Sequence, residues 1–421
     1  MGDMQEKNLN TISFEACQEL DARDSLGQFR SQFDLPEHTC YLDGNSLGAL
    51  PKATLPRVQQ VVQQEWGRDL ISSWNKHGWW DAQQRVGDKI ALIIGAGPGE
   101  VLVADSTSVN LFKTVAAALQ LNPGKVVVSE RANFPTDLYM LEGLIKHLGR
   151  GYKLRLVDSP EDLFEAIDSD VSVAVLTHVS YRTGCMLDMA ATTAHAHARG
   201  ALVVWDLAHS AGAVHVDLTG ADVDFAVGCG YKFLNGGPGA PAFLYVAKRL
   251  QDKVQQPLTG WFGHAKPFAF EPSFEAAPGI QRFQCGTPPI ISLAALEVGV
   301  DLMLQAPLPA IRDKSVALGC LFWRLMEQEC SQLGFRLASP AAPAQRGSQI
   351  CFAHPEGYAI MQALIELGVV GDFRAPDILR FGFAPLYVRY VDVWEAVQGL
   401  KLVMQERLWD QPVHRKRAAV T

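Results

Sequence analysis

The middle of the chain consists of short apolar runs, rich in β-branched residues, that alternate with amphipathic segments. The runs are KVVVSE at 125–130, KLRLVD at 153–158, VSVAVLTHV at 171–179, ALVVWDL at 201–207, DFAVGC at 224–229 and PAFLYVA at 241–247. Helix-like segments separate several of them, at 137–148, 159–167 and 189–199. Strands that are apolar on both faces and alternate with helices are typical of a mostly parallel sheet. The pattern predicts a large α/β region over about residues 60–290.

The pattern changes near residue 291. Long amphipathic helices are expected at 292–304 and 311–333, and strand-like segments follow at 348–354 and 378–384. This change predicts a smaller α+β domain made of residues 291–421, joined by residues 1–59 folding back. The predicted fold class is therefore α/β, with a large domain around a mostly parallel mixed sheet and a smaller α+β domain.

The composition and net charge of the chain limit the kinds of molecule that it is expected to bind. The chain has 421 residues, of which 48% are hydrophobic and 19% charged, so it can bury a large core and is not a disordered chain. Its 37 basic and 45 acidic side chains give a formal net charge of −8, which provides no sequence-wide attraction for nucleic acid or anionic lipid. No stretch approaches the roughly 18 apolar residues that span a bilayer. The expected partners are small molecules and a second copy of the chain.

The eight cysteines are scattered singly, and no CxxC pair occurs. This spacing argues against a zinc ribbon, an Fe–S ligand set or a redox dithiol, and a disulfide framework is unexpected in so long a chain. The N-terminal MGDMQEKNLN is polar and lacks the apolar stretch of a signal peptide. We therefore expect reduced thiols, no metal site and a cytoplasmic protein.

The densest chemical signal is DFAVGCGYKFLNGGPGAPAF at 224–243, an apolar strand that runs into Gly-Tyr-Lys and a glycine-rich loop. It places Lys232 near a strand end, beside Tyr231, Phe233 and Leu234. Apolar neighbours favour a neutral, nucleophilic amine, which suits Schiff-base chemistry. The alternative is a solvent-exposed lysine that follows an edge strand.

A carboxylate and a histidine precede this lysine in WDLAHSAGA at 205–213. The strand ALVVW delivers Asp206 to its carboxyl end, the edge where open α/β sheets bind ligands, and His209 follows three residues later. Pyridoxal 5'-phosphate (PLP) needs such a carboxylate, because a protonated pyridine nitrogen makes its ring an electron sink. Asp206 alone would be read as a helix N-cap. Together with Lys232 it indicates a PLP site.

A phosphate-binding segment is expected further upstream. ADSTSVNLFK at 104–113 places Ser106, Thr107 and Ser108 directly before a helical run. Hydroxyl groups and free N–H groups at a helix N-terminus bind phosphate. The same residues alone would be an ordinary helix cap, but in company with Lys232 and Asp206 they fit the phosphate of PLP.

An ordered series of motifs covers residues 40 to 390 and resembles the kynureninase family. The motifs are YLDGNSLG (41–48), NFPTD (133–137), SYRTG (180–184), WDLAHSAGA (205–213), GCGYKFLNGGPGAP (228–241), GWFGH (260–264), CGTPPI (285–290) and LRFGFAPLY (379–387). The resemblance implies a fold-type-I PLP enzyme, near the class V aminotransferases, that acts as a homodimer with active sites shared between subunits. It implies hydrolysis of the Cβ–Cγ bond of L-kynurenine, or of its 3-hydroxy form, to an anthranilate and L-alanine.

The resemblance also assigns roles to individual residues. Lys232 would be the Schiff-base lysine, and Thr107, Ser108 and Tyr231 would hold the phosphate. For the reaction itself, our hypothesis is that the freed amine of Lys232 removes the α-proton and that Tyr231 relays a proton to the alanine fragment. Asp206 would pair with the pyridine nitrogen, and Arg380 would bind the substrate's α-carboxylate. The remaining cofactor contacts would come from His209, Phe134 and Asp137, and from Trp261 and Thr287 of the second subunit.

Some of these residues have plainer interpretations, and other functions stay open. Arg380 in ILRFGF would otherwise form a surface salt bridge, and Phe134 and Trp261 would be packing residues. The cluster SSWNKHGWW at 72–80 would either cover an arylamine or lie in a dimer interface. A class V aminotransferase, a cysteine desulfurase and a non-catalytic PLP-binding protein are the rival functions. For the desulfurase, Cys320, Cys330 and Cys351 are expected in helices or strands, where burial is their better interpretation.

Overall fold

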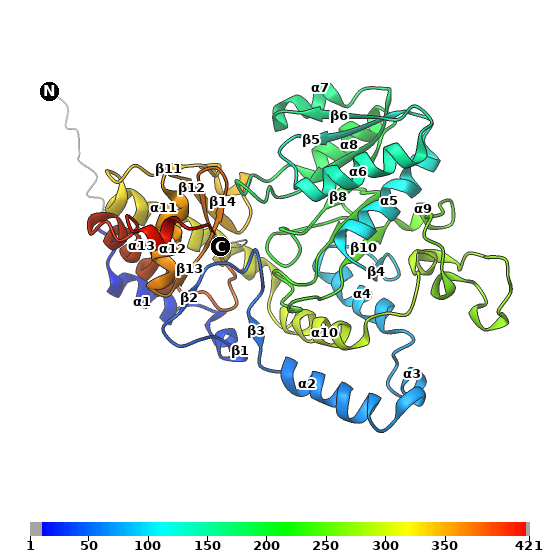
Figure 1. Cartoon of the computed structure of the whole chain (residues 1–421), viewed down its shortest axis with the longest axis horizontal. Coiled ribbons are helices and arrows are strands. Elements are labelled where there is room, and N and C mark those ends of the chain that lie inside the picture. The colour runs from blue at the N-terminus through cyan, green and yellow to red at the C-terminus, as the bar shows by residue number, and fades with distance from the viewer. Residues whose placement is uncertain (1–10, 418–421) are drawn as a thin grey trace.

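The chain folds around a seven-stranded and a four-stranded β-sheet, with two further two-stranded sheets, as a computed structural model describing residues 11–417 shows (Figure 1). The larger sheet has seven strands in the order β4-β10-β9-β8-β7-β5-β6. They are β4 (Val101–Val103), β5 (Val126–Glu130), β6 (Lys153–Val157), β7 (Val171–Thr177), β8 (Leu202–Asp206), β9 (Phe225–Gly228) and β10 (Phe243–Val246).

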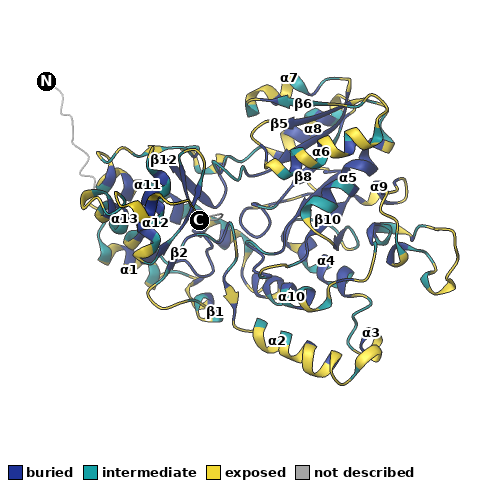
Figure 2. Ribbon diagram, in the orientation of Figure 1, coloured by how far each residue is buried: buried dark blue, intermediate teal, exposed yellow. Residues whose placement is uncertain are grey.

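The predicted mostly parallel mixed sheet is confirmed. Neighbouring strands from β6 through β5, β7 and β8 to β9 pair in parallel, whereas β10 runs antiparallel to both β9 and β4. Every residue of β7, β9 and β10 is buried, as expected for strands covered on both faces (Figure 2). All six strands expected from the apolar runs are present. β4 was missed because three residues are too few to show a pattern.

Helices cover both faces of this sheet and connect its parallel strands. They are α4 (Ala82–Ile93), α5 (Thr107–Leu121), α6 (Pro135–Leu148), α7 (Leu163–Ala166), α8 (Met189–Ala198) and α9 (Lys248–Gln251). The chain leaves β8 at Asp206 and β9 at Gly228, so the segments that carry Asp206 and Lys232 begin at the same edge. This edge faces the second sheet (Figure 1).

The smaller sheet is antiparallel, in the order β11-β12-β15-β14. Its strands are β11 (Arg336–Leu337), β12 (Gln349–Ala353), β14 (Asp372–Arg374) and β15 (Ile378–Gly382), and the helices beside it are α11 (Leu308–Cys330), α12 (Gly357–Glu366), α13 (Tyr390–Gln405) and α14 (Pro412–Arg415). The N-terminal segment returns to this region, because α1 (Phe14–Ala22) packs on α13 and β2 (Cys40–Tyr41) pairs with β13 (Val369–Val370).

Residues 33–76 lead from the region of the small sheet to the lower side of the large-sheet region (Figure 1). β1 (Phe33–Asp34) pairs with β3 (Leu50–Pro51), and α2 (Thr54–Gln60) leads through the π-helical turn Val61–Trp66 to α3 (Ser73–Lys76). We call residues 54–76 the arm; it extends along the bottom of Figure 1. α10 (Ile290–Leu304) packs on both α2 and α4. The division of the chain near residues 60 and 290 into two domains stays a prediction.

Among residues 11–417, no single helix is long and apolar enough to cross a membrane. Only α10 and α11 together reach the required length and composition, and the two are bent by 84° relative to each other.

Candidate active site

Asp206 and Asp137 come together from the ends of β8 and β5, two parallel strands that β7 separates in the sheet. Asp206 is the last residue of β8, and its Oδ1 accepts a hydrogen bond from the Ala208 N–H at 2.7 Å. Asp137 lies in the first turn of α6, which follows β5. Both side chains are almost fully buried. This edge of the sheet therefore holds two adjacent carboxyl groups away from water.

The two carboxyl groups perturb each other. Burial raises the pKa of Asp137 well above its usual range, and the charge and hydrogen bond of Asp206 raise it further. Burial also raises the pKa of Asp206, although the positive charge of Lys232 opposes this shift. Two adjacent buried carboxyl groups retain a proton unless a cation lies beside them. Among the described residues, Asp137 Oδ2 has no hydrogen-bond partner, so the pair is open to such a ligand.

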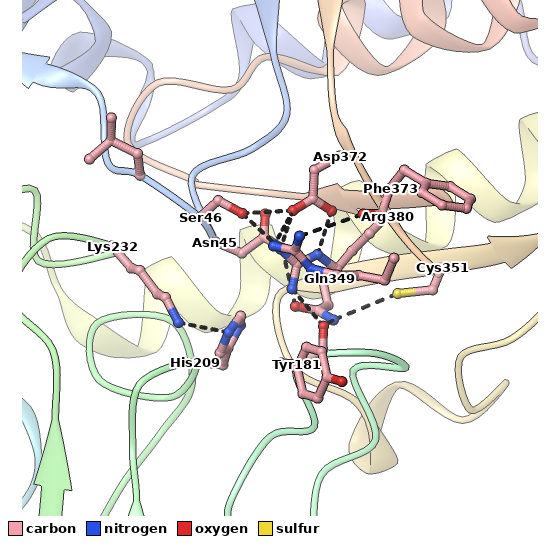
Figure 3. Close-up of polar contacts among 12 residues, drawn as sticks. Asn45, Ser46, Tyr181, His209, Lys232, Gln349, Cys351, Asp372, Phe373 and Arg380 are labelled. Atoms are coloured by element: carbon pink, nitrogen blue, oxygen red, sulfur yellow. Dashed lines mark hydrogen bonds and ion pairs between the residues drawn. The ribbon is translucent and has the colours of Figure 1, made fainter. Parts of the chain in front are cut away.

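Lys232 and His209 face each other beside this pair, as Figure 3 shows, with Lys232 Nζ 2.9 Å from His209 Nε2. Burial, followed by the charge of Lys232, lowers the pKa of His209 well below its usual range, although the nearby amide of Gln349 partly opposes this. His209 is therefore a neutral imidazole at physiological pH. Its buried Nδ1 has no hydrogen-bond partner within residues 11–417.

Tyr231 lies next to the lysine and keeps its proton. Its ring centroid is 5.7 Å from Lys232 Nζ. Burial raises the pKa of Tyr231 above its usual range, and Cys229 and Asp206 add to the shift. A protonated phenol beside an amine can donate and return a proton, as a relay must.

Close contact with the N-terminal segment holds the Lys232 loop. The Gly48 N–H donates to the Tyr231 carbonyl at 2.8 Å. A side chain at position 48 would collide with the Lys232 carbonyl and with Asn235, so only glycine permits this approach. The glycine of the YLDGNSLG motif therefore has a structural role at the lysine.

Thr107 and Ser108 open α5, as a phosphate site would require. The preceding Ser106 caps the helix, because its hydroxyl accepts from the Val109 N–H at 3.4 Å. Thr107 and Ser108 are both partly exposed. Lys113 on the same helix is fully buried and forms an ion pair with Asp105, which has φ +46°. This ion pair, between a buried lysine and a partly exposed carboxylate, holds the turn from which α5 begins.

Phe134 stands at the same edge of the sheet with its ring uncovered. It is the N-cap of α6 and precedes Pro135, which occupies the first helical position. Its side chain is 44% exposed, and its ring makes an edge-on contact with Tyr181 at a centroid distance of 5.2 Å. The packing alternative is therefore wrong for this phenylalanine, because a core residue would be covered.

Arg380 comes to the site from β15 of the small sheet. Its side chain is 1% exposed, so the surface-salt-bridge alternative is wrong, and it makes a buried ion pair with Asp372. Figure 3 shows its guanidinium between Asp372 and Ser46 on one side and Tyr181 on the other. Arg380 and Lys232 thus come from different sheets and face the same space. The charge of Arg380 contributes to the lowered pKa of His209.

Trp261 and Thr287 lie elsewhere in the chain. They belong to the segment between α9 and α10, much of which forms the loops at the right edge of Figure 1. Trp261 is 38% exposed and contacts Trp80, Phe268 and Phe270. The Phe262 N–H donates to the Cys285 carbonyl at 3.0 Å, which keeps the two segments together. No contact among the described residues joins either side chain to Lys232, so their contribution to a second subunit's site stays a prediction.

The aromatic cluster at 72–80 packs largely against itself and this same segment. Trp74 contacts Trp79, Trp80 and Phe262. The Trp79 indole N–H donates to Glu65 at 2.7 Å. The cluster therefore ties the arm to the loop that carries Trp261, and its role toward an arylamine stays open.

Several residues near the site were not singled out by the sequence. Thr177, the last residue of β7, lies opposite Asp206 in the sheet and donates a hydrogen bond to Asn133. Gln349 reaches from β12 to the Tyr181 carbonyl at 3.2 Å. The strand-end position of Thr177 was a usable signal, because Asp206 was found in that way. The other contacts join segments far apart in the chain, and no spacing reveals them.

The residues present fit PLP. The buried carboxylate of Asp206, at the end of β8, is available to pair with a protonated ring nitrogen, and Lys232 lies close to this carboxylate. Asp137 Oδ2 and His209 Nδ1 are buried polar atoms that lack a protein partner among the described residues, and Phe134 offers an uncovered ring. A helix N-terminus with two hydroxyl residues suits the phosphate. Such orphaned polar atoms are what a polar, aromatic ligand would complete.

Comparison with known proteins agrees with this site. Residues 311–400 match the family model described as the kynureninase C-terminal domain. Kynureninase from Pseudomonas fluorescens is 53% identical over 410 residues, covering 96% of this chain and 99% of its own. Kynureninase from Burkholderia pseudomallei (strain 1106a) is 54% identical over 407 residues, covering 96% and 98%.

Solved structures share the fold at lower identity. The apo cysteine desulfurase from Thermococcus onnurineus NA1 superposes with a TM-score of 0.76 at 18% identity, covering 90% of this chain and 98% of its own. A cysteine desulfurase from Escherichia coli gives 0.75 at 20%, covering 91% and 98%. A C-DES variant with glycine covalently linked to its PLP cofactor gives 0.75 at 19%, covering 90% and 99%.

The solved structures share the type-I fold, and together with the kynureninase relatives they define the class, that of fold-type-I enzymes dependent on PLP. The sequence relatives then separate this chain from the desulfurases that share its fold. The chain belongs to the kynureninase family.

Proposed function

We propose that the protein hydrolyses the Cβ–Cγ bond of L-kynurenine to anthranilate and L-alanine, with L-3-hydroxykynurenine as an alternative substrate. The observation that carries the proposal is the meeting of Lys232, Asp206 and His209 on the large sheet with Arg380 on the small one. The amine of Lys232 and the buried carboxylate of Asp206 thus lie opposite the guanidinium of Arg380, a cation suited to bind the carboxylate of an amino-acid substrate. Family membership supplies the bond that is cleaved.

The large-sheet residues hold the cofactor and move protons. PLP, when bound, withdraws electrons from the amino acid and so makes its α-proton acidic. Asp206 keeps a proton on the ring nitrogen, because a charged partner in this buried site is favoured over a lone carboxylate. Lys232 holds the cofactor before the substrate arrives and then removes the α-proton as a general base.

The other site residues orient the substrate and complete proton transfer. Arg380 holds the α-carboxylate. His209 lies beside Lys232 and, because it is neutral, adds no second positive charge next to the amine. Tyr231, which stays protonated, returns a proton to the alanine fragment. Phe134 covers the ring, and Thr107 and Ser108 hold the phosphate.

We also propose a homodimer in which Trp261 and Thr287 of one subunit complete the site of the other. The arm and the 258–291 segment support this, because they expose many large apolar side chains. These are Leu55, Val62, Trp66, Leu70, Ile71, Leu258, Trp261, Phe268, Phe270, Phe274 and Ile291. An exposed patch of this kind marks an interaction surface. All eight cysteines are free, which supports a reducing cytoplasm as the location.

The thiols argue against the desulfurase alternative, whose chemistry needs a reactive cysteine. Cys320 and Cys330 lie within α11, and Cys351 lies in β12. Burial raises the pKa of Cys330 to about 12 and that of Cys351 to about 11, so both stay protonated. The expected burial of Cys330 and Cys351 is confirmed, whereas Cys320 is only partly buried.

The proposal is tested by adding L-kynurenine to the PLP-loaded enzyme and following anthranilate fluorescence, with L-alanine measured in parallel. Equal amounts of both products support hydrolytic cleavage. Amino-group exchange with pyruvate and no anthranilate would instead identify an aminotransferase. Sulfur release from L-cysteine would identify a desulfurase, and cofactor binding without any product would identify a non-catalytic PLP-binding protein.

A further inference from the structure

Arg380 and Asp372 are directly opposite each other on neighbouring antiparallel strands. The register of β14 and β15 pairs Asp372 with Arg380, so both side chains leave the sheet on the same face. Arg380 Nε donates to Asp372 Oδ1 at 2.7 Å, and Arg380 Nη2 donates to Asp372 Oδ2. The side chains are 1% and 3% exposed. The carboxylate therefore holds one edge of the guanidinium in a bidentate contact inside the protein.

Two further acceptors hold the same guanidinium. Arg380 Nη2 donates to the Ser46 hydroxyl at 2.7 Å, and that hydroxyl donates in turn to Asp372 Oδ2 at 2.8 Å. Arg380 Nη1 donates to the Tyr181 carbonyl at 2.6 Å. Among the described residues, four of the five guanidinium N–H donors thus have acceptors, and one N–H of Nη1 does not. The guanidinium plane is fixed, with a single free donor left for a ligand.

Asp372 also separates Arg380 from a second arginine. Arg374 Nη2 lies 2.8 Å from Asp372 Oδ2, so one buried carboxylate contacts two guanidinium groups. Without its charge, Arg374 and Arg380 would repel each other at close range. Arg380 would then lose both the partner that orients it and the charge that keeps its neighbour apart.

We propose that Asp372 is a positioning residue, which with the hydroxyl of Ser46 sets the orientation in which Arg380 receives the substrate's α-carboxylate. This inference rests on the proposed role of Arg380 as the carboxylate-binding residue. A long side chain that is already held loses less rotamer freedom on binding, so the effect of Asp372 is on affinity. Asp372 itself does not touch the reacting atoms.

The test is the PLP-loaded Asp372→Asn variant, which keeps the shape of the side chain and removes its charge. We expect the KM for L-kynurenine to rise about 10- to 100-fold, the range for a lost charged hydrogen bond, with kcat changed less than about threefold. Kynuramine, which is kynurenine without its carboxylate, is the discriminating probe. Its dissociation constant, followed by the change in cofactor absorption, is expected to stay within about twofold.

Asp377→Asn is the matched control. Asp377 lies in the same hairpin, but its carboxylate is 31% exposed and lies 3.9 and 3.8 Å from Arg182 and Arg336. Its neutralisation is expected to leave KM and kcat unchanged. Equal weakening of kynurenine and kynuramine binding in Asp372→Asn would overturn the inference, because a general structural defect affects both. An unchanged kynurenine KM would overturn it as well.

Two more variants distinguish a failure of this inference from a folding defect and from a failure of the proposed function. Ser46→Ala removes a smaller part of the same arrangement and is expected to raise the kynurenine KM about three- to tenfold. It takes the place of Asp372→Asn if that variant does not fold, and an unchanged KM would then overturn the inference. Arg380→Lys tests whether Arg380 binds the substrate's α-carboxylate. An unchanged KM for L-kynurenine in this variant contradicts the proposed role of Arg380. A raised KM in Arg380→Lys with normal Asp372→Asn kinetics contradicts only the positioning role.

Discussion

The two halves of the candidate site, Asp137 and His209 on the large sheet and Arg380 on the small one, differ in how completely the protein satisfies the polar atoms of these side chains. At the edge of the large sheet, Asp137 Oδ2 and His209 Nδ1 are buried without a partner among the described residues. On the small sheet, four N–H donors of Arg380 already have acceptors. Unpaired buried polar atoms cost free energy, so the first half is one that a ligand completes. The second half is arranged before its ligand arrives.

This difference matches the two kinds of ligand. A cofactor that stays bound can stabilise the folded chain, because a ligand at 1,000 times its dissociation constant adds about 4 kcal/mol to stability. A substrate that must enter and leave benefits instead from a fixed receiving group. Four substitutions test this comparison, and they follow in order of expected effect.

Replacing the amine of the large-sheet half is expected to have the largest effect. Lys232→Ala removes both the group that holds the cofactor and the general base, so anthranilate formation is expected to fall at least about 1,000-fold. The measurement is the initial rate of anthranilate fluorescence. Lys248→Ala, at an exposed lysine that opens α9, is the control and is expected to keep full activity. Appreciable turnover by Lys232→Ala would remove this lysine from the chemistry.

Neutralising the buried carboxylate is expected to have the next largest effect. Asp206→Asn cannot keep a proton on the cofactor's ring nitrogen, so kcat is expected to fall about 100-fold or more while the protein stays folded. Steady-state kinetics with saturating PLP measure it, and far-UV circular dichroism checks the fold. A kcat within a few-fold of the parent enzyme would show that Asp206 serves only to hold the turn after β8, through the Ala208 N–H, since no helix begins there.

The phenol beside the lysine is expected to contribute less. Tyr231→Phe keeps the ring and removes the proton that burial holds on the hydroxyl. A relay contributes through one proton-transfer step, so we expect kcat to fall about 10- to 100-fold. Rapid-quench measurement of anthranilate and L-alanine shows whether the formation of one product is slowed more than that of the other. Normal turnover with unchanged product partitioning would end the relay hypothesis.

The smallest expected effect concerns pH on the small-sheet side. Burial, followed by the charge of Asp372, raises the pKa of Asp43 to about 7, although Arg380 and Arg374 oppose the shift. Below this pKa Asp43 is neutral; above it, its charge competes with a substrate carboxylate for the arginines. The KM for kynurenine is therefore expected to rise a few-fold between pH 6 and 8, about one unit either side of that pKa.

The same shift has a consequence for stability with a definite sign. A carboxyl group whose pKa is raised by folding stabilises the fold most at low pH, and this contribution is lost as pH rises through about 7. Asp43→Asn is expected to flatten both profiles, that of KM and that of the midpoint of thermal unfolding. If the variant and the parent chain show the same pH dependence of KM, Asp43 does not act on the arginines.

The sequence predicted the large sheet well because its strands are buried on both faces. Such strands are continuous apolar runs, and their carboxyl ends share one edge, so the pattern placed Asp206 and Lys232 near one another, as the structure has them. Their roles toward a cofactor stay predictions. The contacts of Arg380 were not found. Ser46 and Arg380 are 334 residues apart, and only the folding back of the N-terminal segment brings them together. No local pattern encodes that contact.

The segments that carry Trp261 and Thr287 show a second limit. Both side chains are exposed, and no contact among the described residues joins either of them to Lys232. Their expected roles depend on a second subunit and came from the family resemblance. The aromatic cluster at 72–80 is packed against the same loop, which its composition alone did not indicate.

The most direct measurement is reduction of the PLP-loaded protein with borohydride, followed by mass mapping of its peptides. Covalent attachment of one cofactor per chain on the peptide containing Lys232, with none in Lys232→Ala, is the expected result. A label on another lysine, or no label on a protein that still forms anthranilate, would contradict the assignment on which the whole site is built.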